Sequence, residues 1–77
     1  MMKNEYNITL RWDNEAFVWI ATSDDVPGLV LEHDSLDILM GRVRLAAPEL
    51  LELNYNFVGE ANFEFFMSHN ERLVVSG

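Results

Sequence analysis

The chain has 77 residues, contains no cysteine and carries 13 acidic residues against five lysines and arginines, for a net charge of −8. The length fits one small domain, and the lack of cysteine excludes disulfides and thiolate metal sites. The charge opposes direct binding to nucleic acid or to an anionic membrane and favours a basic partner, and because no stretch is apolar enough for a signal peptide or a membrane span, we expect a cytoplasmic protein.

The first part of the chain predicts a β-hairpin. Apolar and polar residues alternate over residues 6–12, which is typical of a strand with one face in water. A polar turn at residues 13–16 leads to a second strand over residues 17–22, rich in β-branched and aromatic side chains. Two strands joined by so short a turn are expected to pair antiparallel.

Pro27 and Gly28 mark a corner after the hairpin. Proline presets φ at the first central position of a turn, and glycine supplies the positive φ that a type II turn requires at the second. We therefore predict a structural turn here, followed by a short third strand at residues 29–32. Asp34 or Ser35 is the predicted N-cap of the helix that follows.

A long helix is predicted over about residues 35–53. The stripe of apolar residues at helical spacing runs through Pro48, which ought to break a helix. We predict one helix kinked near residues 46–48; the alternative is two helices with Pro48 in the first turn of the second. The predicted core-facing residues are Leu36, Leu39, Met40, Val43, Ala47, Leu50 and Leu51.

The last part of the chain predicts a fourth strand over residues 61–67, with Phe63, Phe65 and Met67 facing inward. Residues 72–75 suggest an additional edge strand. The predicted architecture is therefore α+β: two layers in the order β-β-β-α-β, or with one more strand, in which one long helix packs on one face of an antiparallel sheet.

No catalytic or cofactor site is predicted. His33 and His69 are the two histidines, and neither has a second His or Cys at zinc-ligand spacing. The acidic groups at residues 13–15 and 24–25 lack the spacing of a calcium loop, and turn chemistry explains both. No phosphate-binding glycine loop or nucleophile elbow occurs. We expect a non-enzymatic protein without metal or cofactor, in which His33 is structural or solvated.

The helix carries apolar residues outside its core stripe. Ile38 and Leu45 lie nearly opposite that stripe, with Gly41 between them. A mid-helix glycine costs about 1 kcal/mol relative to alanine, which suggests close approach by another chain; the alternative is that Gly41 is merely tolerated. We predict a homodimer or higher homo-oligomer through this helix face; the competing interface is the open sheet face, or residues 72–75 added to a neighbour's sheet edge.

Several segments carry a resemblance to a known family. They are Trp12-Asp13, Val18 to Ser23, Asp24-Asp25, Pro27-Gly28-Leu29 and Ala47 to Leu51. In this order they resemble the small HicB-like domains, most closely a short stand-alone branch of unknown function related to HicB. The resemblance covers roughly residues 6–54, and it implies that the whole chain, residues 1–77, is one HicB-like domain with a β-β-β-α-β fold.

The resemblance also implies a role. HicB antitoxins bind and cover HicA, a small basic toxin that cleaves mRNA, so the implied partner is a basic HicA-like protein. The predicted partner contacts are Trp19, Asp24, Asp25 and Glu32. Many HicB proteins carry a C-terminal DNA-binding segment, and this chain ends about ten residues after its predicted fourth strand. The alternative function is an orphan structural or regulatory domain that self-associates and has no toxin partner.

Overall fold

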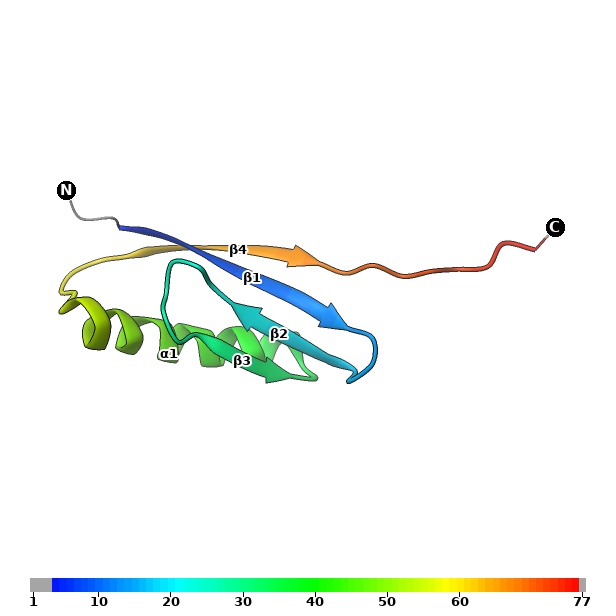
Figure 1. The fold of residues 1–77 in the computed structure, drawn as a ribbon, viewed down its shortest axis with the longest axis horizontal. Coiled ribbons are helices and arrows are strands. Elements are labelled where there is room, and N and C mark those ends of the chain that lie inside the picture. The colour runs from blue at the N-terminus through cyan, green and yellow to red at the C-terminus, as the bar shows by residue number, and fades with distance from the viewer. Residues whose placement is uncertain (1–3, 77) are drawn as a thin grey trace.

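The computed structural model describes residues 4–76. Strands β1 (Glu5–Asp13) and β2 (Val18–Thr22) form the predicted antiparallel hairpin, and β3 (Val30–His33) pairs antiparallel with β2. Helix α1 (Leu36–Tyr55) then runs across one face of the sheet, and β4 (Asn62–Ser68) follows it. The strand order is β3-β2-β1-β4, so β3 and β4 are the two edges (Figure 1).

The predicted two-layer α+β fold is confirmed, but the sheet is mixed rather than wholly antiparallel. β4 runs parallel to β1, with Ile8 opposite Phe65 and Leu10 opposite Met67. The reason is the connection. Two successive antiparallel pairings make β3 parallel to β1, and a helical crossover returns the chain to the end of the sheet where β3 began. The strand after the helix therefore points the same way as β1 and β3.

The core lies between the sheet and α1. The alternating pattern of β1 buries one face of that strand, and the helical stripe buries its predicted side. The buried residues are Tyr6, Ile8, Leu10, Ala21, Val26, Leu29, Leu39, Val43, Ala47 and Leu51. No buried residue in residues 4–76 is polar or charged, so the hydrophobic effect is the main force that holds the two layers together.

The helix is continuous, so the two-helix alternative is wrong. Ser35 is the N-cap, and its hydroxyl accepts a hydrogen bond from the Ile38 N–H at 3.3 Å. Pro48 lies inside α1 with its ring exposed, while Ala47 and Leu51 on either side of it are buried. Packing of these neighbours on the sheet holds both halves of the helix in place, which offsets the hydrogen bond that proline cannot donate.

The Pro27-Gly28 corner is the predicted turn. Gly28 has φ +86°, and the Leu29 N–H donates to the Val26 carbonyl at 3.2 Å, as a type II turn requires. The corner packs on the C-terminal half of α1, where the Asn54 side-chain amide donates to the Pro27 carbonyl. Val26 and Leu29, on either side of the turn, are buried in the core.

The C-terminal part of the chain differs most from expectation. Met67 is 60% exposed although it was predicted to face inward, because α1 packs closest to β2 and β3 and leaves the end of β4 uncovered. Residues 72–75 pair with no strand within residues 4–76, and Leu73 and Val75 are 78% and 94% exposed. We name residues 69–76 the tail.

The tail extends far beyond the sheet, roughly along the direction of β4 (Figure 1). The radius of gyration is 15.0 Å, against about 11–12 Å for a compact chain of this length. The helix that precedes β4 is too polar to cross a membrane, and no other helix occurs in residues 4–76.

Candidate protein-binding surface

The sheet face opposite α1 is uncovered and partly apolar. The strand register places Val30, Thr22, Thr9 and Phe66 in one row across all four strands, and Ile20 lies in the adjacent row between Arg11 and Glu32. Val30 is 71% exposed and Phe66 is 49% exposed. We name this set, together with Glu64, the open face. Val30 and Phe66 lie on the two edge strands, and Ile20 lies between those edges on β2, so the exposed apolar area of this face is spread among polar residues.

The predicted partner contacts fall into two groups. Asp24 and Glu32 are exposed, and Glu32 lies on the open face. Trp19 faces the other way, toward α1, where it packs against the core and against Trp12. Asp25 accepts a hydrogen bond from the Asn7 backbone N–H at 2.7 Å, which gives this carboxylate a structural role. These four side chains therefore do not share one face.

Ser23 works with Asp25 to fix the loop before the corner. Its hydroxyl donates to the Asn7 carbonyl at 2.6 Å and accepts from the backbone N–H groups of Asp25 and Val26. The two side chains thus satisfy both backbone groups of Asn7 beyond the end of β2. This explains why the loop lies along β1 instead of projecting into solvent.

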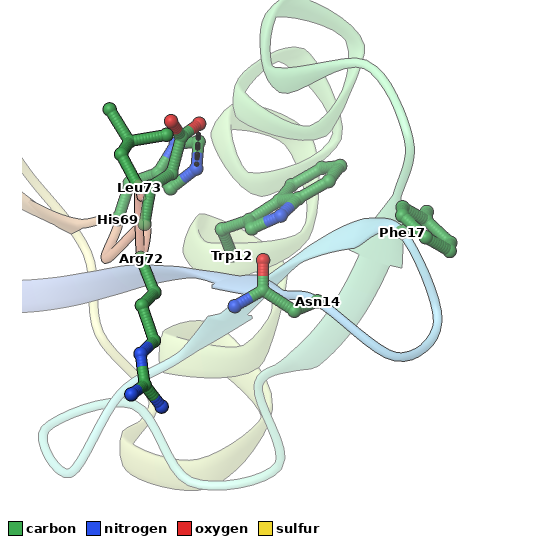
Figure 2. Close-up of a pocket in the computed structure, with 7 residues that line it drawn as sticks. Trp12, Asn14, Phe17, His69, Arg72 and Leu73 are labelled. Carbon is green, nitrogen blue, oxygen red and sulfur yellow. Dashed lines mark ion pairs between the residues drawn. The ribbon is translucent and has the colours of Figure 1, made fainter. Parts of the chain in front are cut away.

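Four rings meet where the tail leaves the sheet. The ring centroid of Trp12 lies 5.5 Å from that of Trp19 and 5.6 Å from that of His69, and Phe17 lies at 6.5 Å. We name these four residues the aromatic corner. All of them except Trp19 line an open hollow of about 500 Å³, and Figure 2 shows His69 and Leu73 on one side of Trp12 and Phe17 on the other. Ring packing of this kind fixes the start of the tail.

The hollow beside the aromatic corner has a mixed polar and apolar lining. His69 Nε2 lies 3.0 Å from Glu71 Oε1, and both side chains are exposed to solvent. Asn14, Arg72 and Leu73 complete the lining of the hollow, which therefore contains no hydroxyl or thiol nucleophile. Within residues 4–76 there is no group of three or more His, Cys, Asp or Glu side chains placed to hold a metal ion.

The hairpin turn presents Phe17 in a strained conformation. Phe17 has φ +56°, a region that residues other than glycine and asparagine adopt rarely, and its side chain is 68% exposed. The turn is fixed by Asp13, whose Oδ1 accepts from the N–H groups of Glu15 and Ala16 at 2.9 and 3.3 Å. These two hydrogen bonds lower the pKa of Asp13 below its usual range, because they stabilise the charged carboxylate.

His33 has the structural role that was expected of it. Its Nδ1 accepts a hydrogen bond from the Ser35 N–H at 2.8 Å, next to the helix N-cap. The Asp34 carboxylate lies 3.0 Å from the same nitrogen. Because Nδ1 accepts the hydrogen bond from the Ser35 N–H, it does not at the same time donate one to Asp34.

The predicted helix-face interface is exposed but sparse. Ile38 and Leu45 are 49% and 74% exposed, and a Cβ added at Gly41 would meet no heavy atom within 4 Å. No close approach within this chain therefore explains the glycine. Contact between these residues and a second chain stays a prediction.

The comparison with protein-family models decides the family. The model for a domain of unknown function, DUF1902, matches residues 5–76. The chain belongs to the DUF1902 family. A crystal structure of a hypothetical protein from the extremely thermophilic bacterium Thermus thermophilus is similar to this DUF1902 domain, with 38% identity and a TM-score of 0.69. The match covers 92% of this chain and 99% of the thermophile's chain. No match was found among the curated proteins.

Sequence patterns missed two parts of this surface. The contact of His69 with both Trp12 and Trp19 depends on β4 being parallel to β1, which local periodicity does not reveal. The burial of Val26 was also missed, although its position directly before Pro27-Gly28 was a usable signal: a type II turn packed on a helix places its flanking residues in the core.

Proposed function

We propose that this DUF1902 domain is a non-enzymatic protein-binding module that covers a small basic protein, as HicB-like antitoxins cover a HicA-like mRNA-cleaving toxin. The open face is the proposed contact surface. The supporting observation is its composition: exposed Val30 and Phe66 lie at the two ends of a row whose middle is Thr22 and Thr9, with Glu32 and Glu64 in the rows on either side. Apolar area supplies affinity, and the carboxylates select a basic partner.

The charge of the whole surface supports the same partner. All 13 acidic residues lie within residues 4–76, and all of them except Asp13 and Asp25 are exposed. The field of such a surface accelerates encounter with a cation-rich protein and repels phosphate backbones. The domain would thus compete with mRNA for the toxin's basic surface, which is a physical route to neutralisation.

The test begins with the genes on either side of the gene for this domain: a short gene that encodes a basic protein is expected there, and its purified product is the partner to be tested. Isothermal titration calorimetry is expected to detect a complex whose affinity falls as salt rises, and stoichiometric addition of the domain should stop mRNA cleavage by the partner. Val30→Lys with Glu32→Lys should weaken the complex at least tenfold by removing apolar area and reversing charge on the open face.

The matched control makes the same change in net charge on a different surface, helix α1. Glu49→Lys with Leu53→Lys alters one acidic and one apolar residue, both exposed on α1, and shifts the net charge by the same amount. This variant should bind with less than a threefold loss. Equal weakening by both variants would indicate general electrostatic attraction without a defined face, and no complex at high micromolar concentration would leave the orphan, self-associating domain as the better account.

A further inference from the structure

Strand β4 is a long edge without cover. It spans seven residues, has no proline, and contains Phe63, Phe65, Phe66 and Met67. Natural proteins rarely leave an apolar edge of this length open, because its free N–H and C=O groups template pairing with another chain. The Asn62 N–H donates to the Asn4 carbonyl, so even-numbered residues of β4 direct their backbone groups toward β1. Phe63, Phe65 and Met67 direct theirs outward.

We propose that β4 pairs antiparallel with β4 of a second copy of this chain. In this dimer, the tail of each copy lies against the other copy, next to the C-terminal end of that copy's α1. The result is a two-fold dimer with one continuous sheet of eight strands. This proposal concerns the sheet edge and is independent of the partner proposed for the open face.

The length, backbone directions and charges of β4 favour one register for the pairing of the two copies. A two-fold axis at Phe65, the midpoint of Asn62–Ser68, uses the full length of the strand and places Asn62 opposite Ser68 and Phe63 opposite Met67. Phe65 directs its backbone groups outward, so the two copies of Phe65 can exchange both hydrogen bonds. A shift that centred the axis on Glu64 would shorten the pairing and bring two like charges directly opposite each other, which is destabilising.

The same register gives the tail a defined place to bind. Continued beyond β4, it brings His69 opposite Ala61 of the second copy, and the tail then runs toward the bend at Gly59 in the segment before β4. Phe57 and Ala61 line a cavity of about 280 Å³, together with Pro48, Leu51, Glu52, Gly59 and Phe63. Because side chains alternate along an extended segment, Leu73 and Val75 share the helix side of the sheet with Phe63 and Phe65. The apolar positions of the tail thus face the side of the sheet on which this cavity lies.

The proposed pairing would also cover apolar side chains that are exposed in the single chain. Met67, on the helix side of the sheet but 60% exposed, would pack on Phe63 of the second copy. Leu73 and Val75, exposed in one chain, would be covered by the other. The anchoring of His69 against Trp12 and Trp19 directs the tail outward along this path. The interface is self-complementary, as a two-fold contact must be.

The first test measures oligomeric state by analytical ultracentrifugation. The native chain is expected to be a dimer at micromolar concentration, and a chain ending at Glu71 should dissociate at least about tenfold more readily because it lacks the apolar tail residues. Met67→Pro should give a folded monomer, since it removes an outward N–H without touching the ladder to β1. Met67→Ala keeps that N–H and should remain a dimer. Ile38→Glu with Leu45→Glu, on the helix face, should leave the dimer intact.

The second test fixes the register by cross-linking, which the absence of native cysteine makes unambiguous. Asn62→Cys with Ser68→Cys should form an intermolecular disulfide on mild oxidation, because directly opposite residues lie within disulfide range, whereas each single variant should not. A native chain that stays monomeric at high micromolar concentration, a Met67→Pro variant that stays dimeric, or cross-linking equally efficient in the single variants would overturn the proposal.

Discussion

The Asp25 carboxylate accepts a hydrogen bond from the backbone N–H of Asn7, 18 positions earlier in the chain, at 2.7 Å. Asn7 belongs to β1, and Asp25 belongs to the loop after β2. The bond extends the contact between hairpin and loop past the last paired residue of β2. It also places Val26 so that its side chain enters the core, where it is fully buried.

Asp25→Ala is therefore expected to destabilise the fold by about 1–3 kcal/mol, the usual effect of removing a hydrogen bond to a charged group. Asp24→Ala is the matched control, because Asp24 is adjacent, acidic and exposed. Chemical denaturation followed by circular dichroism compares the two. An Asp25→Ala midpoint no lower than that of Asp24→Ala would show that the bond to Asn7 contributes nothing to stability.

The sequence alone was sufficient to predict the strands and the helix, and to predict which side of the helix is buried. The periodicity of residues 6–12 and of the stripe from Leu36 to Leu51 reports burial directly, since a side chain repeating at the period of its own element stays on one face. The positive φ of Gly28 followed equally from local chemistry, because few residues other than glycine can occupy that turn position.

The direction of β4 and the exposure of its end required the tertiary structure. Met67 has the alternation of a buried residue, but burial also needs a covering layer, and α1 lies over β2 and β3. The placement of His69 is likewise a consequence of pairing between segments more than 50 positions apart in sequence. The partner contact predicted for Asp25 stays a prediction, and its hydrogen bond to Asn7 within the fold likewise required the tertiary structure.

Substitutions at two glycines are expected to change the stability of the fold in opposite directions. Gly28→Val should destabilise by about 1–3 kcal/mol, because φ is +86° and strain at such a position is of that size. The backbone strain does not depend on a clash of the added Cβ, which would lie 3.5 Å from Leu50 Cδ2, an ordinary contact. Gly41→Ala should stabilise by about 1 kcal/mol, because helix propensity improves and nothing lies within 4 Å. Thermal unfolding of both variants checks the pair; a destabilised Gly41→Ala dimer would instead support a close helix contact between chains.

Phe17 permits a direct measurement of left-handed strain at the hairpin. Replacement by glycine or by alanine removes the same ring, so the difference between the two variants isolates the backbone contribution at φ +56°. Phe17→Gly is expected to be more stable than Phe17→Ala by about 1 kcal/mol, because alanine is strained in this region and glycine is not. Urea unfolding gives the difference. Equal stabilities would mean that the turn relaxes to negative φ once the ring is gone.

Asp13 predicts a specific dependence of stability on pH. Its folded pKa is depressed, mainly by the N–H groups of Glu15 and Ala16, so its contribution to stability is present above the pKa of the unfolded chain, near 3.8, and is lost as the pH falls through the lower folded value. Asp13→Asn cannot titrate. The native chain should therefore have a higher urea midpoint than Asp13→Asn at pH 7, and the difference should shrink below about pH 4.

The cause of this effect can be separated from general electrostatics by adding salt. Backbone hydrogen bonds act at contact distance and persist at about 0.5 M salt, whereas the smaller attraction between Asp13 and Arg11 is screened. Most of the difference between the native chain and Asp13→Asn at pH 7 should survive in high salt. If salt abolishes it, long-range charge and not the turn accounts for the depressed pKa of Asp13, and the hydrogen bonds to Glu15 and Ala16 are too weak to fix the hairpin.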